Sequence, residues 1–132
     1  MRFNAHLSYN GECKAAFELY KECLGGEITL MMTYGSAPGE ASPPELKDKI
    51  VHATLKVGDQ TLTGADVLPA VYEKPKGFAM QLNIDQPEEA RRIYETLSNG
   101  ADVAMPLQKT FWAEHYAVLT DRFGTPWEIN CA

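Results

Sequence analysis

Cysteine is scarce in this sequence of 132 residues, and the three thiols, Cys13, Cys23 and Cys131, follow no metal-ligand spacing. An odd number of such thiols argues against a disulfide framework and is typical of a reducing compartment. The chain also lacks an apolar run of about 18 residues, which a membrane-spanning helix would need, and a signal-peptide pattern before its first predicted strand. We therefore expect a cytoplasmic protein.

Basic residues are also few, because 12 Lys and Arg stand against 18 Asp and Glu, which gives a formal net charge of −6. A nucleic acid or an anionic membrane would require a basic face, so we expect neither as a partner. The hydrophobic content of 45% and the charged content of 23% are ordinary for a globular protein. The length suits one compact domain or two small halves.

What the sequence does contain is an internal repeat. Its first half begins with alternating polar and apolar residues at 2–10, the pattern of a half-buried strand. Residues 12–26 then show helical spacing and end in Gly25-Gly26, which supplies a left-handed helix terminus. Strands are predicted at 27–35 and within 50–67, where residues 57–60 form a tight hairpin turn.

The second half repeats this order. A helix is predicted at 87–100, with Pro87 at its first turn and Gly100 at its end. It follows a strand at 77–85 that places four apolar side chains on one face, namely Phe78, Met80, Leu82 and Ile84. Short strands follow near Val103, at 115–120 and at 126–131. In the two helices, Ala16, Leu19, Tyr20, Cys23 and Gly26 fall in step with Ala90, Ile93, Tyr94, Leu97 and Gly100.

The repeat predicts an α+β fold of two βαβββ modules, about 1–68 and about 77–132, joined by a linker at 69–76. Each module has one helix to cover one face of its sheet. We expect the facing module to bury the other face, so that the two mixed sheets form a concave cup suited to a small molecule. Repeated halves leave strand edges, and we therefore expect a homodimer.

Several stretches resemble one branch of a known superfamily. They are LSYNGEC, AAFELYKECLGGE, MMTYG, IVHATLKVGD and the ending MPLQKTFWAEHYAVLTDRFGTPWEIN. These stretches are similar to the PhnB-like branch of the vicinal oxygen chelate superfamily, which includes glyoxalase I, ring-cleaving dioxygenases and bleomycin-resistance proteins. The resemblance covers nearly the whole chain. It implies a single glyoxalase-like domain, 1–132, with a glyoxalase/bleomycin-resistance-like fold.

The resemblance also implies a divalent metal ion, such as Zn, Ni, Mn or Fe, held by four His, Glu or Gln residues on the first and last strands of the halves. Aligned by core parity, the four positions fall at or near Asn4, Ala79, Thr63 or Ala65, and Glu128. Glu128 alone is a ligand type there, and a useful site needs about three protein ligands. We therefore expect no metal at the standard site.

Strand alternation supplies the candidate contacts inside the cup. Phe3, Leu7 and Tyr9 are predicted to face the helix, which turns the intervening side chains toward the cup. Together with the loop aromatics, the predicted ligand-binding residues are His6, Ser8, His52, Thr54, Gln81, Phe111, Trp112 and Glu128. Between His115 and Tyr116 at most one faces the cup, and the pattern does not decide which.

Each candidate has more than one interpretation. His6, His52 and Glu128 are candidates for acid–base catalysis or for a shifted metal site, and the alternative for both histidines is a hydrogen-bonded polar lining. Glu128 in an apolar strand forms either a salt bridge to Lys or Arg or a ligand contact. Phe111 and Trp112 either stack on a ligand or make a core or dimer contact. Loop 35–49, with three prolines and two glycines, is predicted to be a lid or a disordered insertion.

Two functions of different classes follow. The first is a PhnB-like protein that binds a small organic molecule in the cup with a degenerate metal site. The alternative is a divalent-metal-dependent lyase, isomerase or dioxygenase of the vicinal oxygen chelate type that uses His6, His52 and Glu128. A methyltransferase is not expected, because the sequence has no glycine-rich turn after its first strand and one helix per half, not a doubly wound parallel sheet.

Overall fold

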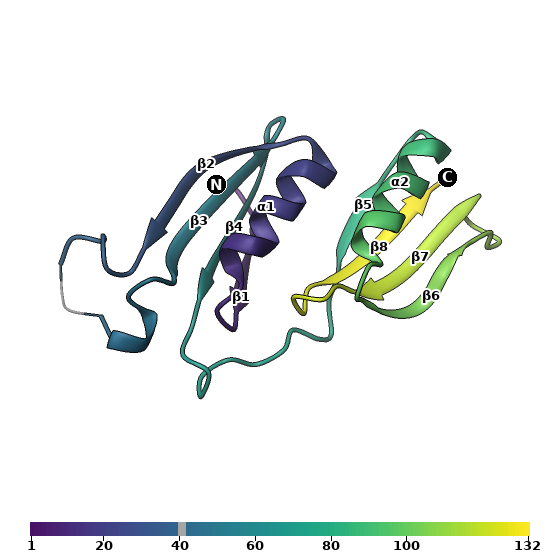
Figure 1. Ribbon diagram of the computed structural model, residues 1–132. Coiled ribbons are helices and arrows are strands. Elements are labelled where there is room, and N and C mark those ends of the chain that lie inside the picture. The colour runs from purple at the N-terminus through teal and green to yellow at the C-terminus, as the bar shows by residue number, and fades with distance from the viewer. Residues whose placement is uncertain (40–41) are drawn as a thin grey trace. The chain divides into compact units, whose positions relative to one another are not determined.

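The computed structural model describes residues 1–39 and 42–132. The chain divides into two compact units, Met1–Glu73 (unit one) and Lys74–Ala132 (unit two), and each is described by itself. The boundary falls within residues 69–76, the stretch predicted as a linker. Both units have the order strand, helix and three strands (Figure 1), so the predicted α+β fold of two βαβββ modules is confirmed.

Unit one contains a four-stranded mixed sheet with the strand order β1-β4-β3-β2. β1 runs parallel to β4, and the other neighbours are antiparallel. The predicted turn at 57–60 joins β3 to β4, where Val57 pairs with Gln60. The elements are β1 (Ala5–Tyr9), α1 (Cys13–Leu24), β2 (Glu27–Thr33), the 3-10 helix η1 (Pro44–Leu46), β3 (Ile50–Val57) and β4 (Gln60–Asp66).

The helix of unit one ends and packs as its sequence predicts. Gly25 adopts φ 76°, and its N–H donates to the Lys21 carbonyl, which terminates α1. The apolar side of α1 packs against β2, β3 and β4. The helix and sheet side chains that form this core are Leu7, Tyr9, Cys13, Ala16, Phe17, Tyr20, Cys23, Ala53, Leu55 and Leu62.

Unit two has the same topology with the order β5-β8-β7-β6, and β5 runs parallel to β8. α2 begins at Pro87, the predicted first helical position, and contacts β7 and β8. Its core comprises Ala90, Ile93, Leu97, Ala117, Leu119, Trp127, Ile129 and Cys131. The elements are β5 (Met80–Asn83), α2 (Pro87–Leu97), β6 (Asp102–Gln108), β7 (His115–Thr120) and β8 (Pro126–Cys131).

The first strand of each unit is shorter than the sequence suggests. Phe3 is 96% exposed and precedes β1, so the prediction that it faces the helix with Leu7 and Tyr9 is wrong. Phe78 is 52% exposed and likewise precedes β5. In both units pairing with the parallel partner strand begins only at Ala5 or Met80, so the alternating pattern extends beyond the residues that have a neighbour in the sheet.

The predicted lid, loop 35–49, includes residues 40 and 41, which lie outside the described residues. On either side of them the chain is tied to itself. The Gly35 N–H donates to the Lys47 carbonyl at 2.9 Å, the Tyr34 N–H donates to the Lys49 carbonyl, and Leu46 in η1 is buried. Both ends of the loop are therefore fixed to the edge of unit one.

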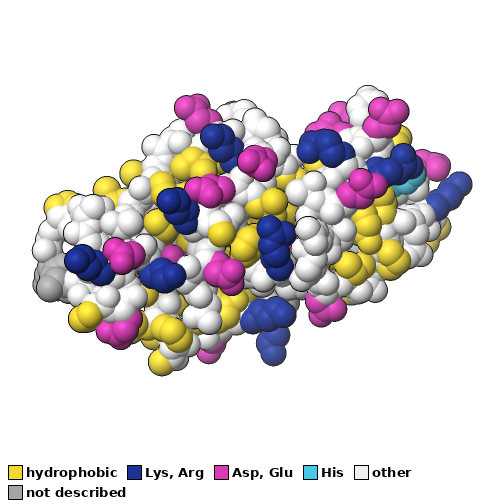
Figure 2. Space-filling view, in the orientation of Figure 1, with side chains coloured by type: hydrophobic (Ala, Val, Ile, Leu, Met, Phe, Trp, Pro, Cys, Tyr) yellow, Lys and Arg dark blue, Asp and Glu magenta, His cyan; other side chains and the backbone are white. Residues whose placement is uncertain are grey.

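The surface carries charges of both signs. Figure 2 shows Lys and Arg side chains interspersed with Asp and Glu on the face that it draws, and no broad area of one sign stands out there. In the part of the chain that the structure describes, neither α-helix is long and apolar enough to cross a lipid bilayer.

Candidate functional site

Unit one brings its two histidines together on the face of the sheet that α1 does not cover. His6 of β1 lies beside Thr63 of β4, and its Nδ1 is 2.8 Å from the Thr63 hydroxyl oxygen. The His52 ring of β3 stacks on the His6 ring with centroids 5.9 Å apart and planes 20° apart. Asn4 Nδ2 also donates to the Thr63 hydroxyl, at 3.1 Å. Thr63, which the sequence offered as a possible position of the metal set but not as a ligand contact, therefore links His6 and Asn4 in this cluster.

The remaining predicted contacts of unit one share this face. Ser8 follows His6 by two residues on β1 and lies beside Ala65, and Thr54 on β3 lies beside Thr63. Alternation along a strand makes such positions face the same side. Both side chains are half-buried, so they can contact a molecule that lies on this face.

Unit two builds a different cluster around Glu128 of β8. Gln81 of β5 lies directly beside Glu128 in the parallel pair, and its Nε2 donates to Glu128 Oε1 at 3.3 Å. The hydroxyl of Tyr116 on β7 donates to the same oxygen. Two neutral donors from the two strands that flank β8 thus hold one oxygen of this carboxylate.

The structure also decides between His115 and Tyr116. Tyr116 lies beside Asn130 and shares the face of Glu128, whereas His115 lies beside Cys131, a fully buried residue of the helix-covered face. Alternation along β7 puts His115 on the same face as Ala117, an apolar residue, and this could have assigned His115 to the helix-covered face. The pattern did not decide the question, because Val118, which shares the face of Tyr116, is apolar too.

The hydrogen bond from Tyr116 to Glu128 alters the acidity of the phenol. This bond, together with desolvation by burial and the negative charge of Glu128, raises the pKa of Tyr116 above its ordinary value of 10.0, while Gln81 acts in the opposite direction. The proton therefore stays on Tyr116 at neutral pH, where the phenol acts as a donor. Within the described residues no Lys or Arg pairs with Glu128, so the predicted salt bridge does not form inside unit two.

The loop between β6 and β7 presents two aromatic side chains next to this cluster. Phe111 is 96% exposed and Trp112 is 49% exposed. The Trp112 ring meets the Tyr116 ring nearly at right angles, with centroids 5.1 Å apart, and the Phe111 ring meets Trp112 in the same way at 4.7 Å. The rings therefore form a continuous series that ends at the phenol bound to Glu128.

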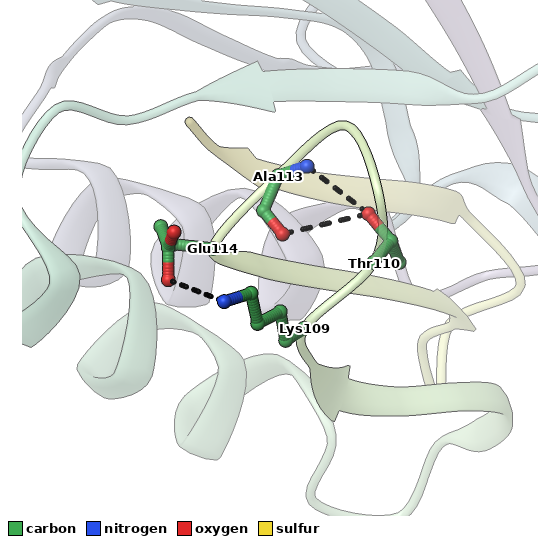
Figure 3. A network of polar contacts seen from close by, with 4 residues as sticks. All are labelled: Lys109, Thr110, Ala113 and Glu114. Carbon is green, nitrogen blue, oxygen red and sulfur yellow. Dashed lines mark hydrogen bonds and ion pairs between the residues drawn. The ribbon is translucent and has the colours of Figure 1, made fainter.

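The same loop is closed at its base (Figure 3). The Ala113 N–H donates to the Thr110 hydroxyl at 3.1 Å, and this hydroxyl donates to the Ala113 carbonyl at 3.5 Å. The Thr110 N–H also donates to the Ala113 carbonyl, at 3.0 Å. Lys109 and Glu114 form an ion pair across the ends of the loop at 3.8 Å. The turn that carries Phe111 and Trp112 is therefore held by its own contacts.

A hollow elsewhere in unit one does not contain the candidate residues. A cavity of about 310 Å³ lies at the start of α1 and is lined by residues that include Gly11, Lys14, Lys49 and Asp66. Its buried carboxylate is occupied, because Asp66 accepts hydrogen bonds from the N–H groups of Cys13 and Ile50. Burial, with a smaller effect of Asp66, raises the pKa of Cys13 to about 12, so this thiol is not an activated nucleophile.

The donor groups within each unit do not fit a resident metal ion. Among residues 1–39 and 42–132, no three or more His, Cys, Asp or Glu side chains come together as a metal site. The possible metal ligands of unit one are His6 and His52, and the Nδ1 of His6 already contacts the Thr63 hydroxyl. The possible ligand of unit two is Glu128, one oxygen of which accepts a hydrogen bond from Tyr116. Neither unit reaches the three ligands that a tightly held ion requires.

Strand register refines which residues correspond between the units. His6 lies beside Thr63 as Gln81 lies beside Glu128, so these two pairs occupy equivalent places in the repeat. Asn4 and Ala79, to which the alignment by core parity pointed, precede β1 and β5 by one residue each. The first-strand side chains next to Thr63 and Glu128 are therefore His6 and Gln81.

Comparisons with known proteins agree with the fold. A protein of Escherichia coli strain K12, YjdN, is 30% identical over 139 residues, which cover 98% of this chain and 95% of that protein. The crystal structure of PA1353 from Pseudomonas aeruginosa has a TM-score of 0.91 and 42% identity, over 99% of this chain and 97% of that chain. A Bacillus cereus structure described as a putative 3-demethylubiquinone-9 3-methyltransferase, PhnB protein, has a TM-score of 0.83 at 18% identity, with both chains fully covered.

The family model described as the Glyoxalase/Bleomycin resistance protein/Dioxygenase superfamily matches residues 2–129, nearly the whole chain. The match therefore extends over both units. The chain belongs to the glyoxalase/bleomycin resistance protein/dioxygenase superfamily, as its sequence motifs predicted.

Proposed function

We propose that the protein binds a small organic molecule on the helix-free face of unit two, without a resident metal ion. The observation that carries this proposal is the Glu128 carboxylate, which accepts hydrogen bonds from Gln81 and from Tyr116, whose ring contacts the Trp112 ring. Binding sites commonly combine aromatic surface with a few fixed polar groups, and this cluster provides both. Phe111 extends the aromatic surface, and the contacts at the base of the loop reduce the entropy lost when a ligand binds.

The roles within this proposed site divide by chemistry. Both described hydrogen bonds to Glu128 end on Oε1, which leaves Oε2 to accept a hydrogen bond from a ligand. The Trp112 and Tyr116 rings supply apolar contact area. Tyr116 and Gln81 fix the orientation of the carboxylate, and neither is required to transfer a proton.

A second candidate is the divalent-metal-dependent lyase, isomerase or dioxygenase. The observation in its favour is the strand register, which places His6 beside Thr63 and Gln81 beside Glu128. Of these four side chains, the His, the Gln and the Glu are of ligand types that the superfamily is known to use. Elemental analysis of protein purified without chelators tests it. One equivalent of zinc, nickel, manganese or iron would favour the metalloenzyme, and its absence from every preparation would favour the binding protein.

A methyltransferase is not part of the proposal. Residues 1–39 and 42–132 form two four-stranded mixed sheets with one α-helix each, and a doubly wound parallel sheet with a glycine-rich turn is not among these elements. The description of the Bacillus cereus protein belongs to that protein, because a likeness at 18% identity extends to the fold alone.

The two tryptophans provide a direct test of the proposed site. In a nuclear magnetic resonance screen of small organic fragments, the indole N–H of Trp112 should shift on binding. That of Trp127 should not, because it is buried and donates to Asp121 Oδ2 at 2.8 Å. Trp112→Ala should weaken every fragment that shifts this face. Fragments that perturb only unit one, or that bind Trp112→Ala unchanged, would contradict the proposal.

We also propose that the protein is a cytoplasmic homodimer that binds neither nucleic acid nor membranes. The edge strands β1, β2, β5 and β6 leave one side without a sheet neighbour in their own unit, and Leu30 on β2 is 38% exposed. The net charge of −6 disfavours polyanionic partners. Light scattering on purified protein measures the assembly, and a monomer mass at micromolar concentration would contradict the dimer.

A further inference from the structure

We infer that the ligand of unit two is an organic cation, a protonated amine carried on an apolar or aromatic body, which binds between Glu128 and the Trp112–Tyr116 rings. This inference rests on the proposed function and names the class of ligand. It is carried by three observations on this unit: the neutral partners of the carboxylate, the oxygen that they leave open and the arrangement of the rings.

The first observation is that no basic side chain neutralises the carboxylate. Within residues 74–132, the described donors to Glu128 are the phenol of Tyr116 and the amide of Gln81, both neutral. The nearest ion pair along the chain joins Lys109 to Glu114 at the base of the loop, so that this lysine is already engaged. A half-buried carboxylate with neutral partners gains most from a ligand that brings a positive charge.

The second observation concerns which oxygen is open. Tyr116 and Gln81 both donate to Oε1, and no described residue donates to Oε2. An ammonium group on Oε2 would form a charge-assisted hydrogen bond, which is about twice as strong as a neutral one. A neutral hydroxyl could occupy the same place, but it would leave the charge of the carboxylate uncompensated.

The third observation is the arrangement of the rings. Phe111 meets Trp112 at 83°, and Trp112 meets Tyr116 at 76°, so that successive rings stand nearly perpendicular to one another. A cation within about 6 Å of an aromatic ring face is attracted to it, most strongly by tryptophan, and perpendicular rings present several faces to one charge. Tyr116 belongs both to this series and to the carboxylate cluster, which places the rings and the acid at one location.

A matched pair of ligands tests the inference at neutral pH. The probes are 2-phenylethylammonium and its neutral counterpart 2-phenylethanol, with affinities measured from the shifts of the backbone amide signals of unit two, which every variant retains. The cation should bind about tenfold more tightly, the preference expected from one charge-assisted contact. Glu128→Gln should remove this preference and leave weak binding of both compounds, whereas Trp112→Ala should weaken both.

The control variant is Glu114→Gln, which removes a carboxylate of the same loop that is paired with Lys109. It should leave the tenfold preference unchanged. Equal affinities for amine and alcohol, both dependent on Trp112, would overturn the cation inference while the proposed function stands. Retention of the preference in Glu128→Gln would also overturn it. Failure of both probes at millimolar concentration would overturn it as well, and the wider fragment screen would then decide the proposed function separately.

Discussion

In unit one the ring of Phe17 on α1 packs over Gly64 of β4, whereas in unit two the equivalent strand residue is Ile129. The matching helix positions show the reverse order. Unit one has the buried Phe17 there, whereas unit two has Arg91, which is exposed. The bulk that fills the space between helix and sheet therefore comes from the helix in one unit and from the strand in the other. The repeat preserves the arrangement of strands and helix, and it leaves the individual core side chains free to change.

The helix-free faces show the same freedom in their chemistry. His6, Thr63 and His52 in unit one occupy the places of Gln81, Glu128 and Tyr116 in unit two. In one set a hydroxyl contacts one of two stacked imidazoles, and in the other a carboxylate accepts hydrogen bonds from a phenol and an amide. A single backbone arrangement thus supports two different polar clusters, of which the one in unit two also has the aromatic loop.

The largest effect should come from the buried carboxylate that anchors each unit. Asp121 accepts hydrogen bonds from the N–H groups of Phe123 and Thr125 and from the indole of Trp127, all within 3.0 Å. Asp121→Ala removes the acceptor of three buried hydrogen bonds and should lower the free energy of unfolding by about 3 kcal/mol. Asp66→Ala, which removes the acceptor of two such bonds in unit one, should cost about 2 kcal/mol.

Urea unfolding followed by circular dichroism measures both changes, and amide signals show which unit opens first. Glu22→Gln on the exposed side of α1 is the control, and it should stay within about 0.5 kcal/mol of the parent. A loss of similar size in Glu22→Gln would show that net charge, not the buried hydrogen bonds, determines the result.

The exchange of bulk between the units predicts a smaller, steric effect. A Cβ atom at Gly64 would lie 2.8 Å from Phe17 Cε1 and 3.1 Å from the Leu7 carbonyl oxygen. Gly64→Ala should therefore lower the free energy of unfolding by about 2 kcal/mol, while Ile129→Val, which removes a methyl group from the equivalent place, should cost about 1 kcal/mol. In a double-mutant cycle Phe17→Leu should reduce the penalty of Gly64→Ala, and strict additivity would contradict the steric explanation.

Much of the fold could be predicted because local patterns determine it. Gly25 ends α1, Pro87 begins α2, and the turn at 57–60 joins its two strands, since each depends on the backbone preferences of a few adjacent residues. The exposure of Phe3 and Phe78 could not be predicted in this way. Where a strand begins depends on where its partner in the sheet lies, and alternation within one segment carries no information about a partner about 50 residues away.

The candidate site was predictable as a set of faces and not as a set of contacts. Alternation placed His6 with Ser8 and placed Glu128 opposite Trp127, since parity is a property of one strand. The partners of these residues follow from the register between strands. The sequence offered Thr63 as a possible position of the metal set and left Tyr116 open against His115, but their contacts with His6 and Glu128 appear only in the structure.

The acidity of Tyr116 distinguishes the units in a different way. Glu128→Gln removes the carboxylate that chiefly raises the pKa of Tyr116, so this pKa should fall toward 10.0. Tyr34 in unit one, whose pKa is raised first by burial and then by Asp66, should not change. Absorbance of tyrosinate against pH, with Tyr116→Phe as the subtraction, measures the shift.

A raised pKa in the folded state contributes stability that is fully present below the unfolded value, near pH 10, and is lost as pH rises through the folded pKa. The parent should therefore lose more stability than Glu128→Gln on going from neutral pH to strongly alkaline pH. An unchanged titration of Tyr116 in Glu128→Gln would show that the hydrogen bond to Glu128 does not govern this group.

The smallest effect is expected at the histidine cluster, because its hydrogen bonds are partly open to solvent. Thr63→Val keeps the shape of the side chain but removes the hydroxyl that contacts His6 Nδ1 at 2.8 Å and Asn4 Nδ2 at 3.1 Å. The free energy of unfolding should fall by about 0.5 to 1 kcal/mol, the net value of a solvent-accessible hydrogen bond. Thr61→Val, at the same parity on β4, lacks these contacts and should change stability less. Thr63 holds the place in unit one that Glu128 holds in unit two. Equal effects of Thr63→Val and Thr61→Val would show that the contacts of Thr63 add no stability, so that this position organises a polar cluster only in unit two.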